Sequence, residues 1–336
     1  MAPVLDVRDL AVGFPSQIVV HGVSFHIDPG ETLALVGESG CGKSVTAFAL
    51  MRLLPTTARI LRGEVWFDGT NLVSASPPVM RGLRGRRIAL IQQEPMTSLN
   101  PVLTVGAQIA EVIRRHEKLP HAAARRRVGE LLDMVGIPEP QRRAEEFPHN
   151  FSGGMRQRVM IAMAVACHPL LIIADEPTTA LDVTIQAQVL DLLDGLRRQF
   201  GMAVLLITHD LGVVAQWADR AAVMYAGRIV EQAPVRPFFR QPRHPYARGL
   251  LGASVNEPEG QSGSADSWHY TTRRLNEISG SVASAAGEPG CPFAPRCPEM
   301  IPACRAAPPR LEPVGDGLVA CFRAAETEVP HVAAVG

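Results

Sequence analysis

The chain has no excess of either charge, because 33 Lys and Arg residues balance 33 Asp and Glu residues over 336 positions. Proteins that bind nucleic acid usually carry a strong basic excess, so this balance argues against nucleic acid as a partner. Local basic runs occur at 81–87 and 125–127. Solvated faces of helices or loops explain runs of this kind.

Long apolar runs are also missing. Runs such as "LLIIA" at 170–174 and "MAVLLI" at 202–207 have the length of a strand. None approaches the roughly 20 residues that span a bilayer, and the first residues lack the pattern of a secretory signal. We therefore expect a soluble, cytoplasmic chain. Disulfides are rarely structural in that compartment, so clustered cysteines there suggest metal or redox chemistry.

Strands alternate with helices over most of the sequence. Buried strands are predicted at 32–36, 170–174, 203–208 and 221–225, and helices at 44–54, 105–135, 155–167 and 183–200. This alternation is typical of an α/β domain with a mainly parallel sheet, and the early strand at 18–27 predicts a separate antiparallel layer. A polar segment rich in Gly, Ser and Glu at 255–267 indicates a linker. We predict one domain at 1–254 and a small C-terminal region, rich in Cys and Pro, at 255–336.

The segment "GESGCGKS" at 37–44 fits G-x-x-x-x-G-K-[ST] between an apolar strand and a helix, which is the context of a phosphate-binding P-loop. Its glycines let backbone N–H groups converge on a phosphate, and the helix adds the positive end of its dipole. Lys43 would reach the β- and γ-phosphates, and Ser44 would bind Mg²⁺. The candidate ATP-binding residues here are Gly37, Glu38, Ser39, Gly40, Cys41, Gly42, Lys43 and Ser44, of which Cys41 is interpreted as a small filler.

Two carboxylates follow the predicted strand at 170–174. Asp175 stands where a second anchor for a phosphate-bound Mg²⁺ is expected. Glu176 comes next and is placed to polarise an attacking water as a general base. An isolated Asp-Glu pair would be interpreted as a surface turn, but the apolar strand before it and the P-loop favour the catalytic role.

The segment "FSGGMRQR" at 151–158 resembles the signature of ABC transporter ATP-binding subunits, with Phe151 in place of the common leucine. A flexible turn would explain "SGG" alone, but its place shortly before Asp175 matches the order of motifs in the family. Ser152, Gly153 and Gly154 open a helix and form a second anion-binding N-terminus. The resemblance implies a head-to-tail dimer, in which each ATP lies between one chain's P-loop and the other chain's signature.

Further motifs extend the resemblance over roughly residues 4–250. Gln93 matches the Q-loop glutamine, expected near Mg²⁺ and the attacking water, and 94–101 matches the segment that contacts the membrane partner. Residues 179–182 match the D-loop at the dimer interface. His209 matches the switch histidine that bonds the γ-phosphate, although a lone histidine after a strand is more often structural. Phe14 either stacks on adenine or belongs to the core. The implied fold is a P-loop ABC ATPase core with an antiparallel β layer and a helical subdomain.

Motifs in the C-terminal region resemble one branch of this family. "RHPYARGLL" at 243–251 and "GCPFAPRCP" at 290–298 resemble the dipeptide/oligopeptide permease ATPases, which include nickel importers. Four of the six cysteines lie here: Cys291, Cys297, Cys304 and Cys321. Four thiolates can hold a [4Fe–4S] cluster or Zn²⁺. Because zinc-ribbon C-x2-C pairs are absent and prolines follow two of the cysteines, we favour a structural iron–sulfur cluster; zinc, no metal and a redox-sensing role remain alternatives.

The resemblance implies an ATPase that powers import of short peptides at the cytoplasmic face of the bacterial inner membrane. The expected partners are a second ABC ATPase chain, either different or identical, two transmembrane permease subunits and an extracytoplasmic substrate-binding protein. The expected cofactors are ATP, Mg²⁺ and the [4Fe–4S] cluster. Nickel, glutathione or another small solute is the alternative cargo. A soluble ABC ATPase outside transport would usually show two fused cassettes or a long coiled coil, and neither is found. A non-catalytic interaction protein would not need both Glu176 and His209.

Overall fold

The structure, a computed structural model, describes residues 2–94, 98–179, 181–254, 278, 280–285 and 288–324. The predicted linker at 255–267 lies outside the described residues. So do 95–97 of the segment after Gln93 and Ala180 of the predicted D-loop. Within the described residues, no helix combines the length and the apolar character needed to cross a membrane.

The core sheet has the strand order β11-β12-β10-β9-β3-β8-β7-β6. Five neighbouring strands are parallel: β9 (Arg220–Tyr225), β3 (Thr32–Val36), β8 (Ala203–Thr208), β7 (Leu171–Asp175) and β6 (Ile88–Ile91). Every residue of β3, β7 and β8 is buried, as expected for parallel strands covered on both faces. The predicted mainly parallel α/β core is confirmed.

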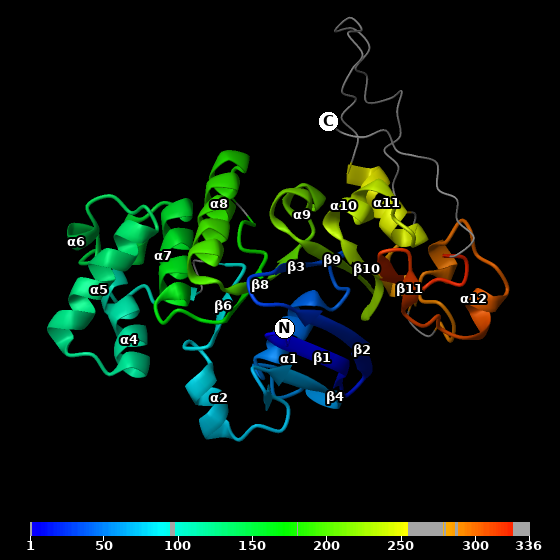
Figure 1. Cartoon of the computed structure of the whole chain (residues 1–336), viewed down its shortest axis with the longest axis horizontal. Coiled ribbons are helices and arrows are strands. Elements are labelled where there is room, and N and C mark those ends of the chain that lie inside the picture. The colour runs from blue at the N-terminus through cyan, green and yellow to red at the C-terminus, as the bar shows by residue number, and fades with distance from the viewer. Residues whose placement is uncertain are drawn as a thin grey trace, which may run out of the picture.

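An antiparallel sheet forms a second layer with the order β2-β1-β4-β5. Its strands are β2 (Gln17–Ile27), β1 (Leu5–Phe14), β4 (Arg59–Phe67) and β5 (Thr70–Asn71). Apolar side chains of this sheet, of α1 (Lys43–Leu50) and of the core sheet form one buried cluster. Figure 1 shows the antiparallel layer beneath the core sheet, which confirms the layer predicted from the early strands.

Helices gather at one end of the core sheet in Figure 1. They are α4 (Val105–Glu117), α5 (His121–Met134), α6 (Pro140–Arg143), the 3₁₀ turn Pro148–Asn150 and α7 (Gly153–Val165), with α8 (Val183–Phe200) beside them. The single helical stretch predicted at 105–135 is two helices. Lys118 takes the left-handed conformation with φ 54° at the end of α4, and Pro120 precedes α5. Both features end a helix because neither continues the α-helical hydrogen-bond ladder.

Four other helices of the described residues up to 254 are short. They are α2 (Pro77–Leu83), α9 (Leu211–Trp217), α10 (Val235–Arg240) and α11 (Pro245–Ser254).

Helix α8 matches its predicted range. Asp182 caps its first turn by accepting a hydrogen bond from the Ile185 N–H, and Gly201 ends it in the left-handed conformation.

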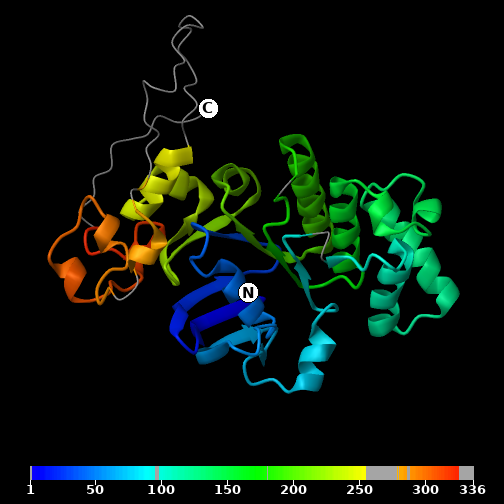
Figure 2. The ribbon, with the colours of Figure 1, turned by 180° about the vertical axis from the view of Figure 1, so that it is seen from behind.

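The described C-terminal residues attach to the opposite end of the core sheet (Figure 2). They contain the 3₁₀ turns Val282–Ala285 and Ala294–Arg296, α12 (Ala303–Ala306), β11 (Glu312–Val314) and β12 (Gly317–Val319). β10 (Arg228–Pro234) is antiparallel to both β9 and β12. The β11–β12 hairpin therefore adds two strands to the edge of the core sheet. We call the described residues 280–285 and 288–324 the tail.

Candidate nucleotide-binding site

The P-loop connects β3 to α1 and passes close to the end of β9. A Cβ atom on Gly37 would lie 2.1 Å from the carbonyl oxygen of Met224, so only glycine fits there. Gly42 precedes α1 with φ 106°, a conformation that side chains disfavour. The structure therefore places both glycines where the backbone must turn tightly, as the motif predicts.

Lys43 is buried and points back along the P-loop. Its Nζ donates hydrogen bonds to the carbonyl oxygens of Gly37 at 2.8 Å and of Glu38 at 3.1 Å. The ammonium group is thus enclosed by the loop that would cradle the phosphates, where a single cation has a strong effect on an anion.

The Ser44 hydroxyl donates a hydrogen bond to the Asp175 carboxylate at 3.1 Å. These two residues come from α1 and from the C-terminal end of β7, 131 positions apart. Burial raises the pKa of Asp175, and the nearby Glu176 charge adds to this, while the Ser44 hydrogen bond and Lys43 lower it. A hydroxyl beside a buried carboxylate is a ligand pair suited to Mg²⁺.

Three other side chains contact the carboxylate of Glu176. Its carboxylate accepts hydrogen bonds from the Gln93 amide at 3.1 Å and from the Thr179 hydroxyl at 3.0 Å. The Nδ1 atom of His209 lies 3.2 Å from its other oxygen. The structure therefore brings together the three predicted catalytic residues Glu176, Gln93 and His209. The contact of Thr179 was not anticipated, although it lies at the start of the predicted D-loop.

The backbone of Glu176 takes the left-handed conformation, with φ 46°. Its N–H donates to the carbonyl oxygen of Ile207 at the end of β8. A side chain held in this conformation is uncommon and costs free energy, and such residues concentrate at functional sites.

The signature opens α7, with Ser152 capping the helix by accepting a hydrogen bond from the Met155 N–H at 3.3 Å. A Cβ atom on Gly154 would lie 2.6 Å from Cγ2 of Ile185 on α8, so the glycine allows α7 and α8 to approach. Among the hydrogen bonds and ion pairs of the described residues, none joins Ser152, Gly153 or Gly154 to the P-loop. α7 and α1 occupy different parts of the fold in Figures 1 and 2.

Phe14, the last residue of β1, is half-buried. It belongs to none of the three buried clusters of the described residues. The alternative assignment of Phe14 to the core therefore lacks support, and stacking on adenine stays a prediction.

The described part of the segment after Gln93 ends in a loop that a buried glutamine holds. The Gln108 side chain donates to the carbonyl oxygens of Asn100 and Leu103, and accepts from the Asn100 N–H. Val102 at the tip of this loop is 75% exposed. Leu103 beside it is also exposed, so the loop presents two neighbouring apolar side chains to solvent. No sequence signal singled out Gln108.

The four tail cysteines line one small cavity of about 10 Å³, together with His244 and Phe293. All four are free thiols, and burial raises the pKa of Cys291 to about 11. Within the described residues, however, no group of three or more His, Cys, Asp or Glu side chains is placed to hold a metal ion. The four predicted ligands are thus brought to one place without the arrangement of a preformed metal site.

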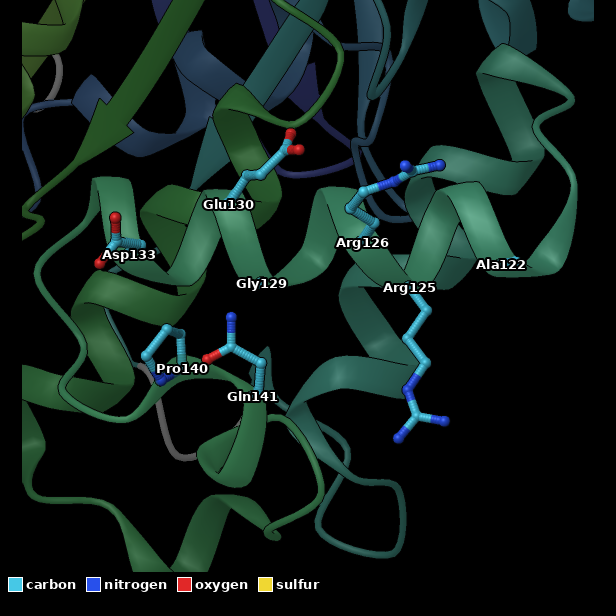
Figure 3. A pocket seen from close by; sticks show the side chains of 8 residues that line it. All are labelled: Ala122, Arg125, Arg126, Gly129, Glu130, Asp133, Pro140 and Gln141. Atoms are coloured by element: carbon cyan, nitrogen blue, oxygen red, sulfur yellow. The ribbon is translucent and has the colours of Figure 1, made fainter.

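A second hollow, of about 710 Å³, lies on α5 and α6, away from the predicted motifs. It is an open groove beside Gly129, where Gln141 of α6 faces α5 (Figure 3). Arg125 and Arg126 of the predicted basic run border this groove. None of the predicted site residues lines it.

Comparison with known proteins agrees with these motifs. The sequence model of the family described as ABC transporter matches residues 20–179, and that of the oligopeptide/dipeptide transporter C-terminal region matches residues 230–304. The chain is 49% identical to the dipeptide transport ATP-binding protein DppD of Bacillus subtilis over 90% of this chain and 89% of that protein. It is 51% identical to the oligopeptide transport ATP-binding protein OppD of Mycobacterium bovis, over 96% of this chain but 52% of that longer protein.

A solved structure shows the same fold. The ATP-binding cassette MJ0796, determined as a dimer in a post-hydrolysis state with ADP and phosphate, aligns with a TM-score of 0.61 and 27% identity. The alignment covers 69% of this chain and 99% of the cassette. The chain therefore belongs to the ABC transporter family, among the ATP-binding subunits of its oligopeptide/dipeptide branch.

Proposed function

We propose that the chain is the ATP-hydrolysing subunit of an importer for short peptides. The observation that carries the proposal is the convergence of Gln93, Thr179 and His209 on the carboxylate of Glu176, beside the Ser44–Asp175 pair. A scaffold that no longer hydrolysed ATP would not need a base and its orienting partners in one place. The names of the relatives support di- and oligopeptides as the cargo.

Each residue has a distinct task in the proposed reaction. Glu176 accepts the proton of the attacking water, and Gln93 and His209 orient its carboxylate. Lys43 and the P-loop N–H groups hold the phosphates in line for attack. Most of the catalysis is therefore positioning and electrostatic stabilisation, and it needs no covalent bond to the protein.

Mg²⁺ fits the donors at the end of β7. The Ser44 hydroxyl and the Asp175 carboxylate are hard oxygen ligands 3.1 Å apart, and Gln93 is the further candidate. When bound, the ion neutralises charge that develops on the phosphates. Ser44 and Asp175 would hold it, while the raised pKa of Asp175 falls once a cation is its neighbour.

We also propose a head-to-tail pairing of two ATPase chains, identical or different. Its support is the separation of the signature from the P-loop within one chain, and the 83% exposure of Val183 directly after the predicted D-loop. The exposed Val102 loop supports contact with two membrane-spanning permease subunits, which would place the chain at the cytoplasmic face of the inner membrane, with a substrate-binding protein outside. We keep the proposed boundary at 254, where α11 ends.

We propose in addition that Cys291, Cys297, Cys304 and Cys321 hold a [4Fe–4S] cluster. The support is that all four thiols border one cavity in the tail. A metal bound there would add folding stability to this small region. The unsuitable present placement of these side chains counts against it.

The cluster hypothesis predicts that the full chain, purified without oxygen, is brown and contains about four iron atoms. Cys297→Ser should remove most of this iron, whereas Cys167→Ser should not, because Cys167 is a free cysteine outside the tail. A colourless wild-type chain without iron would refute the cluster, and bound zinc would identify the alternative metal.

The proposed transport function predicts that Lys43→Ala abolishes both nucleotide binding and uptake. Loss of the buried ammonium removes the cation that faces the phosphates, so the affinity for ATP should fall at least about 100-fold. Uptake of labelled di- and oligopeptides is measured in cells that depend on this chain. Unchanged peptide uptake together with loss of nickel or glutathione uptake would point to the alternative cargo.

A further inference from the structure

An ion pair joins the tail directly to the P-loop. Nη1 of Arg296 lies 3.0 Å from Oε2 of Glu38, the second residue of the P-loop, although the two residues are 258 positions apart. Arg296 ends the 3₁₀ turn that immediately precedes Cys297. Its side chain is 4% exposed, against 28% for that of Glu38. The contact therefore lies inside the protein on the side of the tail.

The guanidinium group of Arg296 contacts several other groups besides Glu38. Its Nη2 donates to the carbonyl oxygen of Ile278 at 2.9 Å, and its Nη1 also lies 3.4 Å from the Tyr225 hydroxyl. The guanidinium carbon stands 5.7 Å from the centre of the Tyr225 ring. A buried charge with several partners has one preferred position, and removal of one partner is costly because the other charge stays buried. Arg296 is therefore held in place by its other partners, and its guanidinium group sets the position of the Glu38 carboxylate.

A second contact holds the backbone of the same residue. The Glu38 N–H donates a hydrogen bond to the hydroxyl of Tyr246 at 2.9 Å, and Tyr246 is fully buried on α11. Its ring packs against those of Tyr225 and Phe293, with centroids 4.6 and 5.4 Å away. Phe293 belongs to the tail and lies two residues after Cys291, so the tail also supports the ring that holds Glu38.

The start of α11 is itself anchored to the core sheet. The Tyr246 N–H donates to Nδ1 of His244 at 3.0 Å, and burial lowers the pKa of His244 to about 3, which keeps this nitrogen an acceptor. The buried carboxylate of Glu231 on β10 accepts the N–H groups of Arg243 and His244 at 2.7–3.1 Å. This chain of contacts gives the His-Pro-Tyr element a physical task, which is to present the Tyr246 hydroxyl to the P-loop.

Glu38 is consequently held at three places. Its carboxylate binds Arg296, its N–H binds Tyr246, and its carbonyl oxygen accepts from Nζ of Lys43. The direction of the loop from Glu38 onward sets where its later N–H groups and Lys43 point, and small displacements of such groups have large effects on a bound anion. The anchoring of Glu38 is therefore part of the geometry of the phosphate site.

We infer that Arg296 is a positioning residue for ATP binding, which acts through Glu38 together with Tyr246 and makes the tail a structural part of the nucleotide site. The inference rests on the proposed function, because it assumes that the P-loop binds ATP. It gives the tail a role at the P-loop, and this role does not depend on a metal at the cysteines.

The test measures the affinity of the purified full chain for MgATP by titration calorimetry. Arg296→Gln should raise Kd about tenfold, a typical size for coupling through a contact network. Arg296→Lys keeps the charge near Glu38 and should restore part of the affinity. Glu38→Gln should raise Kd similarly, and the double variant should be no worse than either single variant, because both remove the same contact.

The matched control is Arg248→Gln. Arg248 on α11 forms an ion pair with Glu299 of the tail at 2.5 Å, so its loss also weakens the attachment of the tail. Among the hydrogen bonds and ion pairs of the described residues, none joins Arg248 to the P-loop. Its Kd for MgATP should stay within about twofold of the wild type, with a comparable loss of thermal stability. An unchanged Kd in Arg296→Gln, an equal rise in Arg248→Gln, or additive effects of Arg296→Gln and Glu38→Gln would overturn the inference.

Two further measurements keep these outcomes interpretable. Thermal unfolding of each variant shows whether it is folded at the temperature of the titration. If Arg296→Gln does not fold, Glu38→Gln alone decides, because its side chain is the more exposed partner. Lys43→Ala is titrated in parallel: a wild-type Kd in that variant would refute ATP binding at the P-loop, which is failure of the proposed function and not of the tail contact.

Discussion

Glu176→Gln is expected to lower ATP turnover about 10²–10⁴-fold while leaving ATP binding intact. The amide has nearly the same shape as the carboxylate, so the contacts of Gln93, Thr179 and His209 lose little packing. It cannot, however, accept a proton from water at neutral pH. In the proposed head-to-tail pair, the step that would separate the two chains is then blocked, so the ATP-bound pair should accumulate.

Turnover and binding are measured on the complete transporter, purified through a tag on this chain. Glu130→Gln serves as the control, because Glu130 is an exposed carboxylate on α5 far from the predicted motifs. Turnover near the wild-type rate in Glu176→Gln would show that another group activates the water. Loss of ATP binding would instead show that Glu176 contributes to the ground-state site.

Sequence reasoning could bring together the residues of the candidate phosphate site because their determinants are local. Lys43 and Ser44 stand in a short pattern between a strand and a helix. Asp175 and Glu176 follow a buried strand, and the carboxyl ends of neighbouring parallel strands meet at one edge of a sheet. The proximity of Ser44 and Asp175 was therefore predictable, although the residues are far apart in the chain.

The contacts of the tail depend on tertiary structure and could not be predicted in the same way. Arg296 and Glu38 are 258 positions apart, and no periodicity links them. The pairing of β12 with β10 involves only Glu231 with Val319 and Gln232 with Leu318, which is too short a pattern to recognise. The break between α4 and α5, in contrast, has a local cause. Pro120 disfavours a continuous helix, so the sequence alone could have divided the predicted range 105–135.

The resemblance predicts that the signature faces the P-loop of another chain, and this placement stays a prediction. The helix dipole and the cap of Ser152 are local properties of α7. Whether this N-terminus faces the P-loop of its own chain or of another chain depends on how α7 packs. Gly154 packs against Ile185 of α8, on the side of the fold that holds the helices. A test of the two-chain site therefore has to separate binding by one chain from turnover by a pair.

Gly154→Asp provides that separation. The variant adds a negative charge at the start of α7, where a partner's triphosphate would lie, and its Cβ would displace Ile185. ATP turnover by the complete transporter should fall about 100-fold or more, because like charges repel at the site where phosphate charge must be stabilised. The isolated chain should bind MgATP as tightly as the wild type, because its own P-loop is unchanged.

Gly195→Asp is the control for the added charge on a neighbouring helix. Gly195 is an exposed position on α8 where an added Cβ meets nothing within 4 Å, so turnover and binding should both stay near the wild type. If Gly154→Asp weakened MgATP binding by the isolated chain as strongly as it reduced turnover, the signature and the P-loop would serve the same nucleotide in one molecule. Retained binding with lost turnover is the result expected if the nucleotide needs a second chain to complete its site.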